Sequence, residues 1–206
     1  MNGQTISWIQ ILQVGGLAGV ISALIGGGVK EIFEHLERRR KARYLALRLA
    51  LILENYYRAC ADRIYDIDLH IGSNGAAGNN FAGFPKLVAY PDDPIAWIYI
   101  NQGVADEVLN LPAEIAAIND GINFNIGMDM DPDGADPDIT LKPLYEMAFR
   151  SIALARKVRS KHKLSKTNRT AESEQQLRGH QEKFLKELRA REQNRSQLLN
   201  PSNDIT

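Results

Sequence analysis

The chain of 206 residues has little of the chemistry that reactive or cross-linked sites require. It has one cysteine, Cys60, so no disulfide can form within the chain. Its four histidines are scattered, and no HExxH, GxSxG, Walker or dinucleotide-binding motif is present. We therefore expect no catalytic residues and no cofactor. A nucleophile assembled from distant residues is the remaining route to an enzyme.

Charge is missing from the first 29 residues and is unevenly spread over the rest. No Asp, Glu, Lys or Arg precedes Lys30. The net charge of the chain is zero, yet residues 30–58 carry +4, residues 62–138 carry −12 and residues 139–206 carry +8. This segregation favours pairing of the acidic middle with the basic ends, within a chain or head to tail. Solvated faces of opposite sign are the plainer interpretation.

The uncharged N-terminal segment is apolar and rich in glycine. Between Trp8 and Val29, the clearly polar side chains are Gln10, Gln13 and Ser22. A helix of about 20 such residues matches the roughly 30 Å hydrocarbon core of a bilayer, and a lone segment in lipid must be helical. We therefore expect residues 1–29 to be a transmembrane anchor.

Small residues recur along one face of this predicted helix. Gly15, Gly19, Ala23 and Gly27 follow one another at four-residue steps. Rows of small residues let helix backbones approach closely in lipid, where packing drives association. The row predicts a helix-association face and a homo-oligomer, although glycine and alanine are also common in spans that do not associate.

A basic cluster follows the apolar segment and contains Arg38, Arg39, Arg40, Lys41 and Arg43. By the positive-inside rule it places the N-terminus outside and the C-terminus in the cytoplasm, with a single pass through the cytoplasmic membrane. A cleaved signal peptide would carry its positive charge on the other side of the apolar segment. The cluster also predicts contact with the lipid bilayer through anionic headgroups, at about 1 kcal/mol per charge. The alternative is a topology signal alone.

The remaining sequence predicts an all-α fold. Residues 30–69 lack proline and glycine and are rich in helix formers, which predicts one long helix that continues the span. Asp93 followed by Pro94 is typical of a capped helix start. We expect that helix to reach about residue 111, with a strand over residues 96–100 as the alternative.

Two further helix starts complete the predicted bundle. Pro112 opens one helix and Thr140 caps another. Together with the long helix, these make a cytoplasmic four-helix bundle over residues 30–164. A charged tail over residues 165–206 has a thin leucine stripe, which predicts a solvated helix with a disordered end and at best a marginal coiled coil.

Two loops interrupt the predicted bundle. Residues 72–94 form a long loop of glycine and asparagine that we expect to be mobile, with its second half extended across the bundle. Residues 129–138 are acidic. Within them, Asp129, Asp131 and Asp133 reproduce the opening of an EF-hand calcium loop. Thr140 stands where a bidentate glutamate is needed, so an acidic loop without metal is the default interpretation.

A second basic run covers residues 156–169 and contains no acid. Such a run can follow phosphates. No aromatic side chain interrupts it to stack on bases, so we do not expect nucleic acid as a partner.

Several stretches together resemble a group of bacterial proteins that have one span, a helical cytoplasmic domain and no assigned function. They are ALRLALILENYYRACADRI, FPKLVAYPDDP and EVLNLPAEI, within residues 10–164. The resemblance implies the architecture and no activity.

These patterns predict a membrane-anchored helical interaction or scaffold protein. It would self-associate through the small-residue face and present its bundle to an unknown cytoplasmic protein partner. The alternative is a pore-forming or membrane-perturbing effector that oligomerises through the glycine-rich span.

Overall fold

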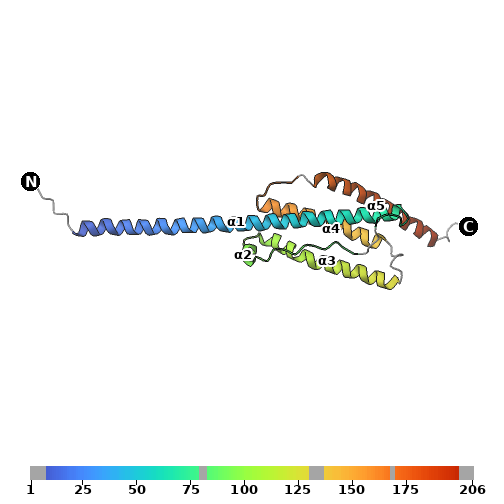
Figure 1. The fold of residues 1–206 in the computed structure, drawn as a ribbon, viewed down its shortest axis with the longest axis horizontal. Coiled ribbons are helices and arrows are strands. Elements are labelled where there is room, and N and C mark those ends of the chain that lie inside the picture. The colour runs from blue at the N-terminus through green and yellow to red at the C-terminus, as the bar shows by residue number, and fades with distance from the viewer. Residues whose placement is uncertain (1–7, 79–82, 130–136, 168–169, 200–206) are drawn as a thin grey trace, which may run out of the picture.

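A computed structural model describes residues 8–78, 83–129, 137–167 and 170–199, with side chains described from residue 30 onward except at some helix ends. In this part of the chain, every regular element is a helix. The helices are α1 (Trp8–Gly72), α2 (Pro94–Trp97), α3 (Gln102–Asp129), α4 (Pro137–Lys161) and α5 (Ala171–Leu199) (Figure 1). The predicted all-α fold is confirmed.

Helix α1 is a single helix of 65 residues. Its C-terminal half lies among the other helices, whereas its N-terminal half projects beyond them (Figure 1). The apolar segment and the long helix predicted after it therefore form one continuous element.

The predicted membrane topology requires correction. Among the residues that the structure describes, none of the helices combines the length and the apolar character needed to cross a bilayer. This finding contradicts the predicted single-pass location in the cytoplasmic membrane. In α1 from Lys30 to Arg43, charged side chains occur in every turn. The apolar run of residues 44–53 that follows is too short, at about ten residues against the roughly 20 that a span needs.

The hydrophobic core lies mainly between α1 and α4, which run antiparallel. Apolar side chains on α1 recur at three- and four-residue steps and face a similar stripe on α4, while α3 covers a second side of α4. Burying each large aliphatic side chain stabilises the fold by roughly 1.5–3 kcal/mol. The central members are Leu45, Leu49, Leu53 and Ile64 on α1, Leu144, Ile152 and Val158 on α4, and Val104, Val108 and Leu111 on α3.

The helix boundaries differ from the predicted ones at two prolines. Helix α3 continues through Pro112, so the predicted helix start there is wrong. Proline removes one backbone hydrogen bond from a helix interior, and the buried side chains of Leu111 and Ile115 on either side keep this helix packed. Helix α4 begins at Pro137 rather than at Thr140, because proline suits the first helical position.

The predicted helix start at Asp93 is confirmed. Its carboxylate accepts a hydrogen bond from the Ala96 backbone N–H at 3.0 Å, and Pro94 opens the short helix α2. The predicted extent of this helix to about residue 111 is wrong, because α2 ends at Trp97 and α3 begins at Gln102. The strand alternative for residues 96–100 is therefore wrong. The segment before it, residues 84–93, runs without regular structure, and its Phe84, Leu87 and Tyr90 pack against the core. This is the extended path that the sequence predicts for the second half of the loop.

A buried ion pair joins α1 to α4. The Arg159 guanidinium donates to both carboxylate oxygens of Glu54, at 2.6 and 3.1 Å, and both side chains are less than one-tenth exposed. A third bond from Arg159 reaches the Ser165 carbonyl oxygen at 3.1 Å. The four-residue spacing of Glu54, Arg58, Asp62 and Asp66 predicts a solvent-exposed ladder. That prediction is wrong for Glu54.

We predict that Glu54→Ala lowers the free energy of unfolding by about 3–5 kcal/mol, because it leaves the Arg159 guanidinium buried without its carboxylate. Urea denaturation followed by circular dichroism measures the loss. Glu54→Leu combined with Arg159→Met removes both charges and should recover most of it. A double variant no more stable than Glu54→Ala would show that the pair matters for a reason other than burial of charge.

Candidate functional site

A groove of about 770 Å³ lies at the end of the bundle from which α1 projects. We call it the basic groove. One wall is α1, the other is the C-terminal end of α4, and Tyr99, just after α2, contributes between them. Its lining residues are Phe33, Leu36, Glu37, Arg39, Arg40, Ala42, Arg43, Tyr99, Lys161, His162 and Lys163.

Positive charge dominates the groove. Five of its side chains are cationic and one is a carboxylate. Among the described residues, none of the five cations has an ion-pair partner. Earlier on α4 the situation is the opposite, since Arg150 pairs with Glu114 and Lys157 pairs with Glu107. Lys161 and Lys163, at and just after the end of α4, therefore keep their full positive charge where they line the groove.

Local structure explains why these cations converge. Arg39, Arg40 and Arg43 lie within about one turn of α1, so they project to neighbouring directions. At the other wall, the chain leaves α4 through a tight turn in which the Leu164 N–H donates to the Arg159 carbonyl oxygen at 2.9 Å. Cations at a helix C-terminus interact favourably with the helix dipole, so Lys161 and Lys163 are well placed there.

His162 ties the C-terminal end of α4 to the residue before α3. Its Nε2 accepts a hydrogen bond from the Asn101 backbone N–H at 3.4 Å, which requires the unprotonated ring nitrogen. Burial lowers the pKa of His162 below its usual range. The imidazole is therefore neutral near pH 7, and the positive charge of the groove comes from its arginines and lysines.

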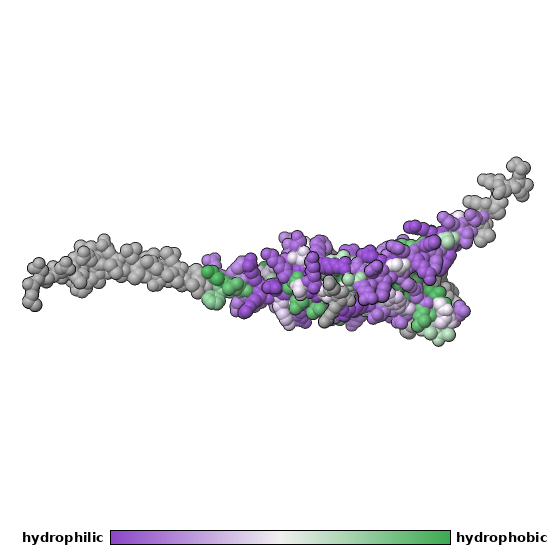
Figure 2. All heavy atoms as spheres, turned by 90° about the horizontal axis from the view of Figure 1, so that it is seen from above, coloured by the Kyte–Doolittle hydropathy of each residue, from purple (hydrophilic) through white to green (hydrophobic). Residues whose placement is uncertain are grey.

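Apolar surface adjoins the cations. Phe33 and Leu36 are 65% and 50% exposed, and Ile32 beside them is 61% exposed. Figure 2 shows this apolar patch where the coloured part of α1 begins, next to strongly hydrophilic surface. The Arg38 guanidinium also lies 6.0 Å from the centre of the Tyr99 ring, within range of a cation–π contact. The groove thus offers an anion several cationic partners and an apolar body a place to pack.

The structure divides the predicted lipid-contact cluster. Arg39, Arg40 and Arg43 line the groove, whereas Arg38 and Lys41 are not among its lining residues. Arg38 instead donates to Glu34 one turn earlier, at 3.1 Å.

Other predicted sites lie outside the described side chains. These are the helix-association face of Gly15, Gly19, Ala23 and Gly27, and the calcium candidates Asp129, Asp131 and Asp133. Both stay predictions. Within the described part of the chain, no group of His, Cys, Asp and Glu side chains is arranged to hold a metal ion.

Cys60 is fully buried in the core between the helices. Burial raises the pKa of its thiol to about 12. Because the thiolate is the reactive form, this cysteine behaves as a core side chain and does not contribute to the groove.

The contribution of α4 to the groove is what the sequence did not reveal. Both basic runs stand out, at residues 38–43 and 156–169, but they are more than a hundred positions apart. The sequence signal for a cationic site was that neither run contains an acidic residue. Which members meet depends on how α1 and α4 pack.

We predict that part of the stability of the protein depends on neutral His162. Its pKa is lowered in the folded state from the usual value of about 6.5. The unfolded chain therefore binds the proton more readily, and the free energy of unfolding falls as the pH drops below about 6.5. His162→Gln keeps an acceptor for the Asn101 N–H but cannot be protonated. Urea denaturation between about pH 7.5 and about pH 5 should show a smaller loss for this variant, and equal losses would contradict the assignment.

Comparison with protein-family models, curated proteins and solved structures finds no match for this chain. The resemblance to bacterial single-span proteins therefore stays a prediction.

Proposed function

We propose that this protein is a helical interaction protein that binds an acidic, amphipathic helix of a partner protein in the basic groove. The observation that carries the proposal is the convergence of five uncompensated cations, from helices distant in sequence, beside exposed apolar side chains.

The chemistry of the groove favours carboxylates as ligands. Arginine presents a planar fork of donors that fits a carboxylate in a bidentate manner, and three arginines lie along one wall. A single carboxylate, Glu37, leaves an excess of four positive charges among the lining residues. A ligand with several acidic groups would neutralise this excess and slow its own dissociation.

The geometry of the groove favours a helix. From Phe33 to Arg43 the wall formed by α1 extends about 15 Å, which equals roughly three helical turns. Apolar side chains lie at one end of this wall and cations at the other. A partner helix with apolar residues in one turn and glutamates or aspartates in the next two turns would match both ends, in the manner of helix-in-groove recognition.

The role of an interaction or scaffold protein is consistent with the rest of the molecule. The buried core between α1 and α4 provides a fixed frame for the groove. We propose no catalytic function. The pore alternative rests on glycines in the part of α1 for which the structure describes only the helical backbone, and no feature of the groove favours it.

Fluorescence anisotropy of a labelled synthetic helix tests the proposal. The probe carries leucine and phenylalanine in its first turn and four glutamates in the next two turns, and a probe with glutamines in place of the glutamates is its control. We expect Arg39→Ser with Arg40→Ser to weaken binding of the acidic probe by about tenfold or more, which corresponds to about 1.4 kcal/mol. Higher salt should also weaken it, because exposed charges are screened.

A matched double variant separates the groove from general positive charge. Lys186→Ser with Arg189→Ser removes two exposed cations from α5, far along the chain from the groove, and should leave affinity within about twofold. Equal weakening by both double variants would contradict the proposal. So would equal binding of the glutamine probe. If vesicles of an anionic lipid bind through Arg39 and Arg40 while the acidic probe does not, the assignment of a protein helix as ligand is wrong.

A further inference from the structure

One side of α1 carries apolar side chains that the rest of the bundle leaves exposed. Residues 44–53 are apolar on nearly every side of the helix, and the inward side chains of this run belong to the core. On the opposite side, Tyr44, Leu47 and Leu51 are 66%, 37% and 45% exposed. A helix that is apolar on all sides is normally covered on all sides. The surface formed by these three residues, which we call the outer face, has no such cover in the described part of the chain.

The outer face continues the basic groove along α1. Residues four apart are neighbours on the surface of a helix. Tyr44 therefore lies beside Arg40, and Leu47 lies beside Arg43, each one turn beyond a residue that lines the groove. Leu51 follows Leu47 by the same step. A ligand that leaves the groove along α1 thus reaches the outer face next.

The apolar surface has a definite end. Beyond Leu51, three- and four-residue steps along the same side of α1 lead to Asn55, Arg58 and Asp62, which are polar and exposed. At the other end, the exposed side chain of Phe33 begins the wall of the groove. The helix from Phe33 to Leu51 is about 27 Å long, which equals five turns. Groove and outer face together therefore match a partner helix of about that length.

The charge along this stretch of α1 is positive. No Asp or Glu occurs between Glu37 and Glu54, and Glu54 is already paired with Arg159. Among the described side chains, none forms an ion pair with Arg48, whose guanidinium lies 6.0 Å from the centre of the Tyr44 ring. A partner of the outer face would therefore gain from a carboxylate near Arg48.

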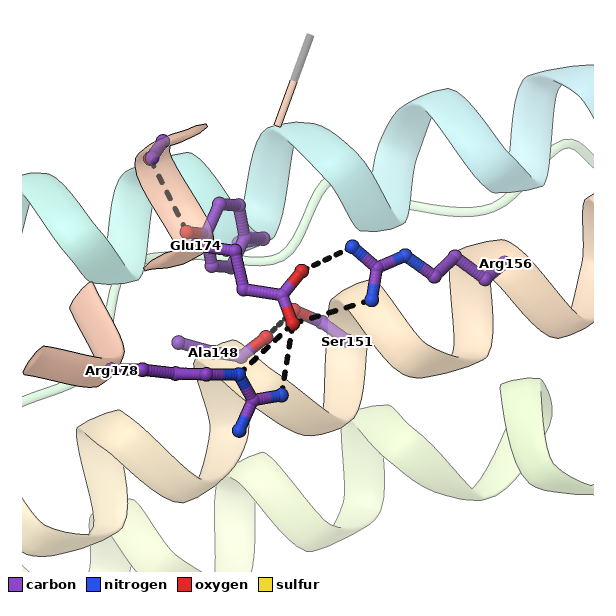
Figure 3. Close-up of polar contacts among 7 residues, drawn as sticks. Ala148, Ser151, Arg156, Glu174 and Arg178 are labelled. Carbon is purple, nitrogen blue, oxygen red and sulfur yellow. Dashed lines mark hydrogen bonds and ion pairs between the residues drawn. The ribbon is translucent and has the colours of Figure 1, made fainter. Parts of the chain in front are cut away.

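Elsewhere in the bundle, an arginine beside an aromatic ring also has a carboxylate within the chain. In Figure 3 the carboxylate of Glu174 lies beside the guanidinium of Arg178, at 2.8 Å. The same guanidinium lies 4.4 Å from the centre of the Phe149 ring. Arg48 has the corresponding ring in Tyr44. The carboxylate is the group that an acidic partner would add.

From these observations we infer that the partner helix extends beyond the groove and packs two further turns on the outer face. The inference rests on the proposed function and makes the partner more specific. The partner's sequence has three parts: apolar residues against Phe33, acidic residues against the arginines of the groove, and apolar residues with one acid against the outer face. An acidic helix without the second apolar part would leave Leu47 and Leu51 uncovered and bind less tightly.

Three synthetic helices test the inference by fluorescence anisotropy with the full chain. One is the three-turn acidic probe. A leucine-extended probe adds two turns that carry leucines and one glutamate, and a glutamine-extended probe of the same length has glutamines in place of those leucines. We expect the leucine-extended probe to bind about tenfold more tightly than either of the others, because its leucines cover the outer face.

Tyr44→Gln with Leu51→Gln removes apolar surface from the outer face without changing its charge. We expect this double variant to weaken binding of the leucine-extended probe about tenfold and to leave the acidic probe within about twofold. Leu109→Gln with Phe124→Gln is the matched control, because these two side chains on α3 are exposed to a similar extent. The control variant should bind all three probes like the unmodified chain.

The outcomes separate this inference from the proposed function. If the acidic probe binds and the leucine-extended probe binds no more tightly, the inference is overturned and the proposed function stands. If none of the probes binds, both are overturned. Equal weakening of the leucine-extended probe by the two double variants would also overturn the inference.

Two further results would assign the outer face to another occupant and overturn the inference. The first is a dimer in sedimentation velocity that Tyr44→Gln with Leu51→Gln converts to a monomer, which would mean that a second copy covers the face. The second is binding of phosphatidylglycerol vesicles that requires Tyr44 and Leu51 while the leucine-extended probe does not bind.

Discussion

The buried pair of Glu54 and Arg159 fixes how α1 lies against α4. The two residues are 105 positions apart, and their bidentate contact is made in one relative position of the helices. A shift of α4 by one turn would leave two charges buried without partners, which is strongly unfavourable. The same relative position brings Lys161 and Lys163 opposite the arginines of α1. The basic groove is thus a consequence of how α1 packs on α4. Glu114 and Glu107 on α3 pair with Arg150 and Lys157, which lie earlier on α4 than the groove.

Much of the fold follows from local rules. The helical character of residues 30–69, the cap at Asp93 and the extended path of residues 84–93 are each specified by neighbours in sequence. The predictions failed where long-range packing overrides local preference. Pro112 is a good helix start in isolation, yet it lies inside α3 because the side chains around it are buried against the rest of the bundle. The transmembrane assignment was also wrong, since in the described part of the chain no helix is both long enough and apolar enough to cross a bilayer.

Half of the site could be found from the sequence. The cluster from Arg38 to Arg43 is conspicuous, and three of its members line the groove. The other half could not, because nothing local distinguishes Lys161 and Lys163, which reach the groove, from Lys157, which is neutralised by Glu107. Glu54 shows the same limit. Its four-residue spacing to Arg58 predicts an exposed ladder, and only the packing of α4 shows that its partner is Arg159.

The central claim is that an acidic helix occupies the basic groove, and amide NMR spectra of the isotope-labelled full chain test it most directly. On addition of the acidic probe, we predict that the signals of Phe33, Tyr99 and Lys163 shift together with one binding curve, because they line one groove from three parts of the chain. Signals of Leu177 and Phe184, which are buried residues of α5, should stay in place. Shifts confined to other surfaces, or Phe33 and Lys163 responding with different affinities, would contradict the account.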